Sequence, residues 1–296
     1  MFDNKLFDVE HALGMHASDF VLMPASAIYE PEQFEQFAAR IPNCHVYMIG
    51  LMPRVETIGS RVEDSSLFTK YEVAGKAHEL RWEFPPECTL RTEGDFCFPV
   101  GPQGQTVYPD NNEEMSQLTQ RGVLNFKVLY VGQAYGTRGS RNALERLLKH
   151  ETLQKISIQE PQDTHALYVL LLEVEADNTV FTVINPRAQE KDEDGERISM
   201  GLDKLFGTDE AERITLYEAS LIRCFKPKYN KEFKDSFPST NLKILKDCYD
   251  KDFSALIAEL YYDELPLIFS DSATPSRHHI IKHDLHEEAE RKAFFE

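Results

Sequence analysis

The segment between Thr208 and Pro227 places the strongest constraint on the fold, because it carries both the start and the stop of one helix. The Thr208 hydroxyl can cap the first turn, and Pro227 ends the helix because it has no backbone N–H to donate. Between them, apolar side chains recur at the spacing of one helix face: Ile214, Tyr217, Leu221, Ile222 and Phe225. We therefore predict an amphipathic helix from about Asp209 to Phe225 that packs on a core.

Glu218 interrupts this apolar stripe, four residues after Ile214 and four residues before Ile222. Residues four apart lie on the same helix face, so the carboxylate is directed toward the core. An unpaired carboxylate is costly to bury. Glu218 is therefore a candidate for pairing with a metal ion or a cation. The alternative is a glutamate at the boundary of the core whose carboxylate reaches water.

The composition indicates a globular protein rather than a membrane or secreted one. At 296 residues and 42% hydrophobic content, the chain is long enough for two domains. It contains no run of eighteen apolar residues, so we expect no membrane span. The N-terminus has no basic region followed by an apolar stretch, which argues against a secretory signal. Five scattered cysteines without a C-x-x-C pair are typical of reduced thiols, so we expect a cytoplasmic protein.

The charge is strongly negative overall but unevenly distributed. A net charge of −18 argues against a passive nucleic-acid coat, since non-specific binding depends on Lys and Arg. Residues 121–150 nevertheless carry six Lys and Arg against one acid, and residues 221–234 carry five against one. These two basic islands predict a local phosphate-binding surface within an acidic shell. Chance clustering is the alternative.

We expect residues 1–115 to form a separate N-terminal α+β domain for recognition or regulation. Short apolar runs at 20–23, 46–51 and 80–84 are typical of strands, and Pro31 can open a short helix. The polar stretch at 109–115 is loop-like and gives the boundary. Residues 1–117 hold 19 acidic against 8 basic side chains, so this domain is expected to meet a protein partner rather than DNA.

Residues 116–296 form the second expected domain. Its pattern predicts a strand at 125–131, a helix from Asn142, and a hairpin made of 166–174 and 179–184. Apolar elements at 256–262 and 265–269 can close the core. A polar helix is expected from about His283 to the end of the chain.

Seven residues of this part follow the order of a known nuclease pattern: Tyr130, Val131, Gly132, Arg146, His150, Glu218 and Asn230. Over roughly residues 122–232, the chain resembles the GIY-YIG nuclease superfamily. The resemblance implies an α+β fold with a small antiparallel sheet flanked by helices. It also implies metal-dependent hydrolysis of nucleic-acid phosphodiester bonds, with DNA favoured. By analogy with the family, restriction and phage defence are the expected settings.

The resemblance assigns a role to each of four catalytic candidates. Glu218 would hold Mg²⁺ or Mn²⁺, since hard cations prefer oxygen ligands. Tyr130 would orient or deprotonate the attacking water. Arg146 would clamp the scissile phosphate with its planar fork of donors. His150, one helical turn after Arg146, would share in proton transfer.

The remaining residues assigned to the site would contact or support the nucleic acid. Gly132 would allow close approach of the backbone, and Asn230 would brace the site. The cationic candidates are Arg141, Lys149 and Lys228.

The first tripeptide of the pattern, which carries its own tyrosine, has no match ten or eleven residues before Tyr130. This departure keeps a second hypothesis open. In it, the chain is a non-catalytic GIY-YIG-like binding or regulatory protein that acts through a protein partner.

Overall fold

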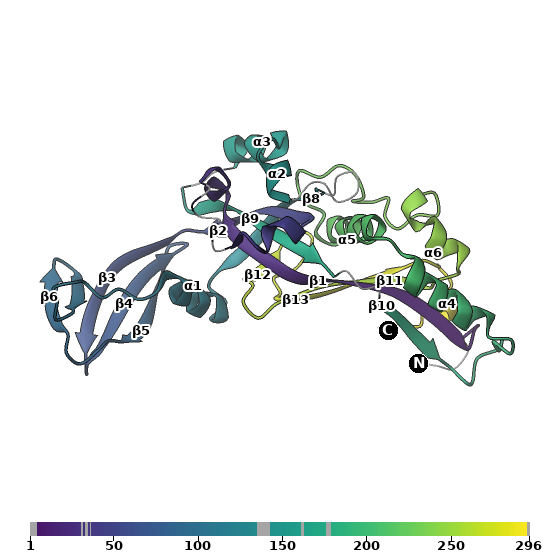
Figure 1. The fold of residues 1–296 in the computed structure, drawn as a ribbon, viewed down its shortest axis with the longest axis horizontal. Helices are drawn as coiled ribbons and strands as arrows, with labels where there is room; N and C mark the ends of the chain where they lie inside the picture. The colour runs from purple at the N-terminus through teal and green to yellow at the C-terminus, as the bar shows by residue number, and fades with distance from the viewer. Residues whose placement is uncertain are drawn as a thin grey trace.

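The computed structural model describes residues 5–30, 32, 35, 37–134, 143–160, 163–175 and 179–294, which form an elongated molecule of mixed α+β structure (Figure 1). The strands are β1 (Val9–Pro24), β2 (Val46–Pro53), β3 (Val55–Glu63), β4 (Ser66–Val73), β5 (Lys76–Glu83), β6 (Thr89–Glu93), β7 (Phe96–Val100), β8 (Asn125–Gln133), β9 (His165–Val174), β10 (Thr179–Ile184), β11 (Ala255–Tyr261), β12 (Leu267–Phe269) and β13 (His278–Asp284).

The helices are α1 (Asn111–Gln120), α2 (Ala143–Leu147), α3 (Glu151–Gln159), α4 (Glu196–Gly207), α5 (Glu210–Phe225) and α6 (Lys246–Asp250). Short 3-10 helices lie at Ala25–Tyr29, Ile41–Asn43, Lys243–Leu245 and Ala289–Arg291. Within the described residues, no helix is both long enough and apolar enough to cross a lipid bilayer.

One eight-stranded sheet organises the described residues, with the order β12-β8-β2-β9-β1-β11-β13 and β10 paired with β1. Most pairs are antiparallel, and the pairs β1–β11 and β8–β12 are parallel. The first half of the long strand β1 pairs with β10 and its second half pairs with β9. The predicted mixed α+β class is therefore confirmed.

The structure does not separate residues 1–115 from residues 116–296. Strands β1 and β2 lie inside the main sheet, where β2 pairs with β8 on one side and with β9 on the other. All eight residues of β2 are buried. A fully buried strand needs partners on both edges, and here later segments of the chain supply them. The predicted N-terminal domain is accordingly corrected to an insert between β2 and β8.

This insert projects from one end of the main sheet (Figure 1). It consists of the three-stranded sheet β3-β4-β5, the hairpin β6–β7 and helix α1. Its apolar face is buried, with side chains from β4 and β5 in the core: Leu67, Tyr71, Val73, Leu80 and Trp82. The strand predicted at 80–84 is part of β5.

Helix α5 forms where the sequence predicts it. Its first turn is capped by Asp209 rather than Thr208, and the Asp209 carboxylate accepts a hydrogen bond from the Glu212 N–H at 2.7 Å. Lys226 ends the helix in the left-handed conformation, directly before Pro227. The apolar stripe is buried against the main sheet, and α5 contacts β8, β1, β9 and β11.

Three other expectations differ from the structure. Strands β9 and β10 do not form a hairpin, because β1 is long enough to pair with each of them along a different half. The polar helix expected from about His283 is wrong: strand β13 runs to Asp284, and the 3-10 helix Ala289–Arg291 is the only helix among the described residues after it. The rings of His279 and His283 are buried against Phe225 and Phe237. The helix expected after Asn142 is the short α2, and α3 follows it separately. Four of the eight residues of the helix expected over 31–38 lie outside the described residues.

Candidate functional site

Two tyrosines from distant parts of the sequence lie next to each other on neighbouring antiparallel strands. Tyr47 on β2 is opposite Gly132 on β8, and Tyr130 lies two residues before that glycine. The Tyr47 and Tyr130 ring centroids are 6.2 Å apart. Both side chains line the same cavity. Tyr47 and Tyr130 therefore meet in the fold, although 82 residues separate them in the sequence.

Gly132 is required by this arrangement of rings. A Cβ atom at position 132 would lie 2.6 Å from Tyr47 Oη and 2.8 Å from Tyr130 Cε1. Contacts below 3.0 Å cannot be made without displacing one of the rings. The close approach expected at Gly132 is therefore made by the Tyr47 side chain.

His150 anchors the Tyr47 hydroxyl. It is the N-cap residue of α3, where its Nδ1 accepts a hydrogen bond from the Leu153 N–H, and its Nε2 lies 3.1 Å from Tyr47 Oη. Burial and then the charge of Arg146 lower the pKa of His150 to about 4, so the ring is neutral at pH 7. Because Nδ1 accepts, the single ring proton is assigned to Nε2, which donates to Tyr47. The Tyr47 hydroxyl is left with its own proton to donate elsewhere.

Arg146 and His150 do not lie on one helix as expected. Helix α2 ends at Leu147, and His150 begins α3. The side chain of Arg146 is exposed and lines the cavity shared by the two tyrosines. Its positive charge acts to lower the pKa of Tyr47 and Tyr130, although burial is the larger effect and raises both pKa values. Both phenols therefore remain protonated at neutral pH.

Glu218 is directed from α5 toward the same cavity and is 9% exposed. Burial, and then the carboxylate of Glu232, raise its pKa to about 8. Hydrogen bonds from the backbone and side chain of Gln133 act in the opposite direction. Among the described residues Glu218 forms no salt bridge, so no cation in that part of the chain compensates its charge. The carboxyl group of Glu218 is therefore buried and does not reach into bulk water as a boundary glutamate would.

Asn230 braces strand β8 from the segment that follows α5. Its Oδ1 accepts from the Val131 N–H at 2.9 Å, and its Nδ2 donates to the Val131 carbonyl at 2.8 Å. The next residue back, Tyr229, donates its backbone N–H to Leu129. These bonds hold the strand that carries Tyr130 and Gly132 against the end of α5.

The cavity itself measures about 520 Å³ and is open to solvent. Its lining combines seven residues of the strands and helices with the segment after α5: Tyr47, Tyr130, Gln133, Arg146, Thr152, Glu218, Ile222, Tyr229, Asn230, Lys231, Glu232 and Phe233. Phenol, carboxylate, amide and guanidinium groups thus converge on one water-accessible space, an arrangement suited to acid–base work on an anionic substrate.

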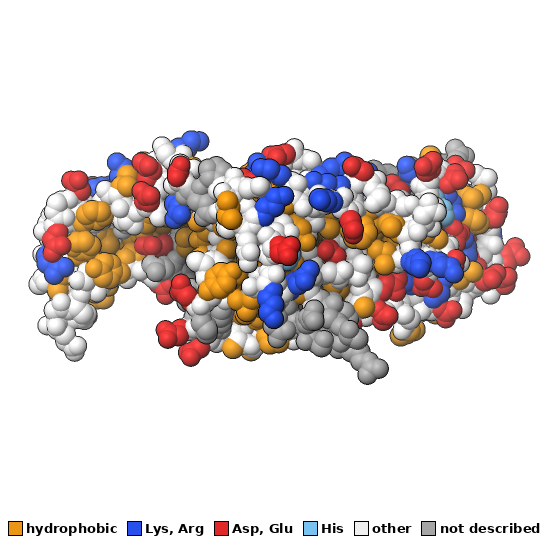
Figure 2. All heavy atoms as spheres, turned by 90° about the horizontal axis from the view of Figure 1, so that it is seen from above, with side chains coloured by type: hydrophobic (Ala, Val, Ile, Leu, Met, Phe, Trp, Pro, Cys, Tyr) orange, Lys and Arg blue, Asp and Glu red, His pale blue; other side chains and the backbone are white. Residues whose placement is uncertain are grey.

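Several cations of the two basic islands form ion pairs with acidic side chains. Lys228 is 2.7 Å from Glu160, which also accepts from the Tyr229 hydroxyl. Arg223 and Lys226 both pair with Asp235, and Lys127 pairs with Asp271. Lys149 is exposed on the segment before α3. Arg141, another expected nucleic-acid contact, lies outside the described residues. In Figure 2, Lys and Arg gather over the middle of the molecule with acidic side chains among them.

Sequence reasoning missed Tyr47, Gln133 and Glu232. The signal for Tyr47 was present, since Val46-Tyr47 begins an apolar strand just as Tyr130 ends one. The insert places 82 residues between the two tyrosines, whereas the pattern places them ten or eleven residues apart. Gln133 directly follows the Tyr130–Gly132 tripeptide and Glu232 lies two residues after Asn230, and nothing in the sequence marks either one.

Comparison with known proteins adds no assignment: no family model, no curated protein and no solved structure matches this chain.

Proposed function

We propose that this chain is a metal-dependent endonuclease of the GIY-YIG type that hydrolyses phosphodiester bonds, with DNA as the favoured substrate. One observation carries the proposal. Tyr47 and Tyr130 lie on adjacent antiparallel strands and face the cavity that also receives Arg146 and Glu218. The resemblance calls for two tyrosines, an arginine and a glutamate around one site, and Tyr47 supplies the group that was missing from the sequence pattern.

The spacing between the two tyrosines is explained by the insert. In the compact pattern, the two strands follow each other closely. Here β3–β7 and α1 are inserted between β2 and β8, while the two strands still pair directly. Loop insertions of this kind change the sequence spacing without changing the strand pairing, since the entropic cost of a longer connection grows slowly with its length.

The residues at Glu218 fit a divalent metal ion. The described residues contain no group of three His, Cys, Asp or Glu side chains around one position. Glu218, with Glu232 lining the same cavity, would therefore bind the ion through one or two carboxylates, and water would complete the shell, as Mg²⁺ prefers. The ion would neutralise negative charge on the phosphate and the leaving oxygen. A bound cation also removes the cost of ionising a buried carboxyl group.

The two phenols would act as donors rather than as bases. Their raised pKa values keep both protonated at neutral pH. Because His150 donates to Tyr47 Oη, Tyr47 keeps its own proton, which it can donate to Tyr130, whose pKa this contact acts to lower, or to a water molecule or phosphate oxygen in the cavity. Tyr47 and Tyr130 would thus orient the attacking water, and Arg146 would bind two phosphate oxygens with its fork of N–H groups.

A cleavage assay on the full chain tests the proposal. Supercoiled plasmid, single-stranded DNA and RNA are incubated with Mg²⁺, Mn²⁺ or EDTA, and Glu218→Gln protein is carried through every condition. We expect metal-dependent nicking of plasmid that is absent with EDTA and with Glu218→Gln. Equal nicking by Glu218→Gln would indicate a contaminating nuclease. The absence of cleavage of all three substrates with either metal would favour the non-catalytic hypothesis.

A further inference from the structure

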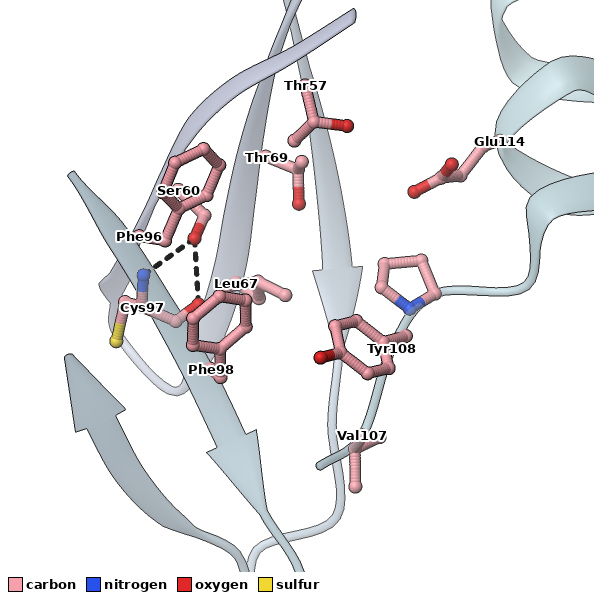
Figure 3. Close-up of a pocket in the computed structure, with 11 residues that line it drawn as sticks. Thr57, Ser60, Leu67, Thr69, Phe96, Cys97, Phe98, Val107, Tyr108 and Glu114 are labelled. Carbon is pink, nitrogen blue, oxygen red and sulfur yellow. Dashed lines mark hydrogen bonds between the residues drawn. The ribbon is translucent and has the colours of Figure 1, made fainter. Parts of the chain in front are cut away.

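The insert contains a second cavity, of about 350 Å³, that takes no part in the proposed nuclease site (Figure 3). Strands β3 and β4 form its floor, β7 covers one side, and the segment 107–109 with α1 covers the other. Its volume is at the small end of the range for ligand pockets, which suits a molecule with one or two rings.

Aromatic and apolar side chains form most of its wall. Phe96 and Phe98 are stacked with centroids 6.1 Å apart, and Tyr108 meets Phe98 edge to face at 5.9 Å. Tyr108 is 66% exposed, so the aromatic wall continues to the mouth of the pocket. Figure 2 shows apolar side chains gathered over this end of the molecule. An exposed apolar patch of this kind usually marks a binding surface.

Two polar groups of the pocket have capacity for a further hydrogen bond or ion pair: the buried Thr69 hydroxyl and the half-buried Glu114 carboxylate. Thr69 is 5% exposed, and its Oγ1 makes no hydrogen bond, although it is near enough to the Tyr71 hydroxyl to act on the pKa of Tyr71. In Figure 3 the Thr69 hydroxyl points into the pocket. Glu114 accepts a hydrogen bond from the Tyr71 hydroxyl but forms no salt bridge with any described residue. By contrast, the Ser60 hydroxyl is satisfied by the backbone of Cys97.

The charge around the pocket is strongly negative. Residues 55–114 contain 12 Asp and Glu against 5 Lys and Arg. Three of these cations already pair with acids: Arg61 with Glu63 and Glu79, Arg81 with Glu83, and Arg91 with Glu93. Such a field attracts a cation and disfavours a phosphate or carboxylate.

We propose that this pocket binds a small organic cation, in which an apolar ring carries a protonated amine. The ring would pack against Phe98 and Tyr108, the ammonium group would pair with Glu114, and Thr69 would accept one of its N–H groups. Cations are attracted to aromatic faces as well as to carboxylates, so both parts of the pocket favour the same ligand. The proposal is independent of the nuclease activity.

Three probes that share a phenethyl group and differ in charge test this on the full chain. Phenethylamine is cationic, phenethyl alcohol is neutral and 3-phenylpropanoate is anionic. Binding is followed by titration calorimetry and by the emission of Trp82, the single tryptophan, which lies opposite Leu67 of the pocket floor. We expect saturable binding of the amine, roughly tenfold or more weaker binding of the alcohol, and no binding of the carboxylate.

Matched variants separate the carboxylate from the overall charge. Glu114→Gln should weaken amine binding roughly tenfold or more, whereas Glu113→Gln, an exposed neighbour with the same change of charge, should leave it unchanged. Phe98→Leu should weaken binding without altering charge, which covers the case in which Glu114→Gln fails to fold. Failure of the amine to bind, equal binding of the three probes, or preferred binding of the carboxylate would each overturn the proposal.

Discussion

The Tyr47 hydroxyl lies 3.1 Å from Nε2 of His150, although 103 positions separate the two residues in the sequence. This contact joins β2 to the start of α3 at the edge of the cavity. It also determines which hydrogen bonds Tyr47 can still make, because the neutral imidazole donates to its oxygen.

Replacing Tyr47 with Phe should reduce metal-dependent nicking by roughly ten- to a hundredfold, because one donor to the reacting water or phosphate is lost. The fold should survive, since the ring still packs in the core and a single hydrogen bond is removed. The nicking rate and the thermal midpoint are measured together. Tyr261→Phe, at an exposed position away from the cavity, is the control. An unchanged rate in Tyr47→Phe would remove this tyrosine from the mechanism.

Glu218→Gln should abolish nicking and increase the stability of the metal-free protein at pH 8. The folded-state pKa of Glu218 is raised from 4.5 to about 8, so the unfolded chain loses this proton first as pH rises. Glu218 therefore does not reduce the free energy of unfolding below about pH 4.5. It reduces this free energy progressively between about pH 4.5 and pH 8, and by a constant amount above about pH 8. The cost is on the order of a few kcal/mol. Urea unfolding of both proteins at pH 4.5 and pH 8 measures it, and exposed Glu264→Gln serves as control. If the difference in the free energy of unfolding between Glu218→Gln and wild type does not increase from pH 4.5 to pH 8, the assignment of a buried carboxyl group is contradicted.

The same ionisation should make metal binding dependent on pH. Below about pH 8, each unit of pH should weaken the apparent affinity for Mg²⁺ or Mn²⁺ by up to about tenfold, because the carboxyl group must lose its proton to bind. Titration calorimetry with Mn²⁺ at pH 6, 7 and 8 tests this. An affinity that is constant over this range would mean that Glu218 is not the principal ligand.

Gly132→Ala should destabilise the fold by about 1–3 kcal/mol, since the new Cβ overlaps Tyr47 Oη and the edge of Tyr130. The cost should fall when Tyr47 is also replaced by Ala, because the nearest atoms are then removed. A double-mutant cycle in urea measures this coupling. Strictly additive effects would show that the two side chains do not compete for the same space.

Arg146→Ala should lower the nicking rate roughly a hundredfold, the loss of about 3 kcal/mol of transition-state stabilisation. Arg141→Ala should have a smaller effect, because the exposed Arg146 side chain already lines the cavity. Parallel kinetics of the two variants decide between them. A larger defect in Arg141→Ala would assign the phosphate contact to that arginine.

Local patterns were sufficient for several elements of the fold. The apolar stripe and Pro227 predicted α5, because both signals act within a few helical turns, although the cap is Asp209 and not Thr208. The apolar runs at 46–51 and 125–131 predicted β2 and β8 for the same reason. Glu218 was identified because a carboxylate in an apolar stripe is conspicuous without any knowledge of the tertiary structure.

Pairing between distant strands required the tertiary structure. Nothing local to residues 46–53 specifies that their partners are β8 and β9, so the N-terminal segment was assigned to a domain of its own. Strand β13 was not predicted, and a helix was expected from His283 near its end, because the strand depends on pairing with β11, which is a neighbour in space.

The sequence by itself determined the elements and most of the chemical groups: the helix that carries Glu218, the strand that carries Tyr130, and the asparagine that follows. It determined these because propensity, capping and periodicity act over short distances along the chain. The tertiary structure alone decided that Tyr47 lies beside Tyr130, that His150 donates to it, and that an insert with its own pocket separates the two strands. Strand pairing across 82 intervening residues is a property of the whole core, because hydrogen bonding and burial select a partner from every strand that the chain can form.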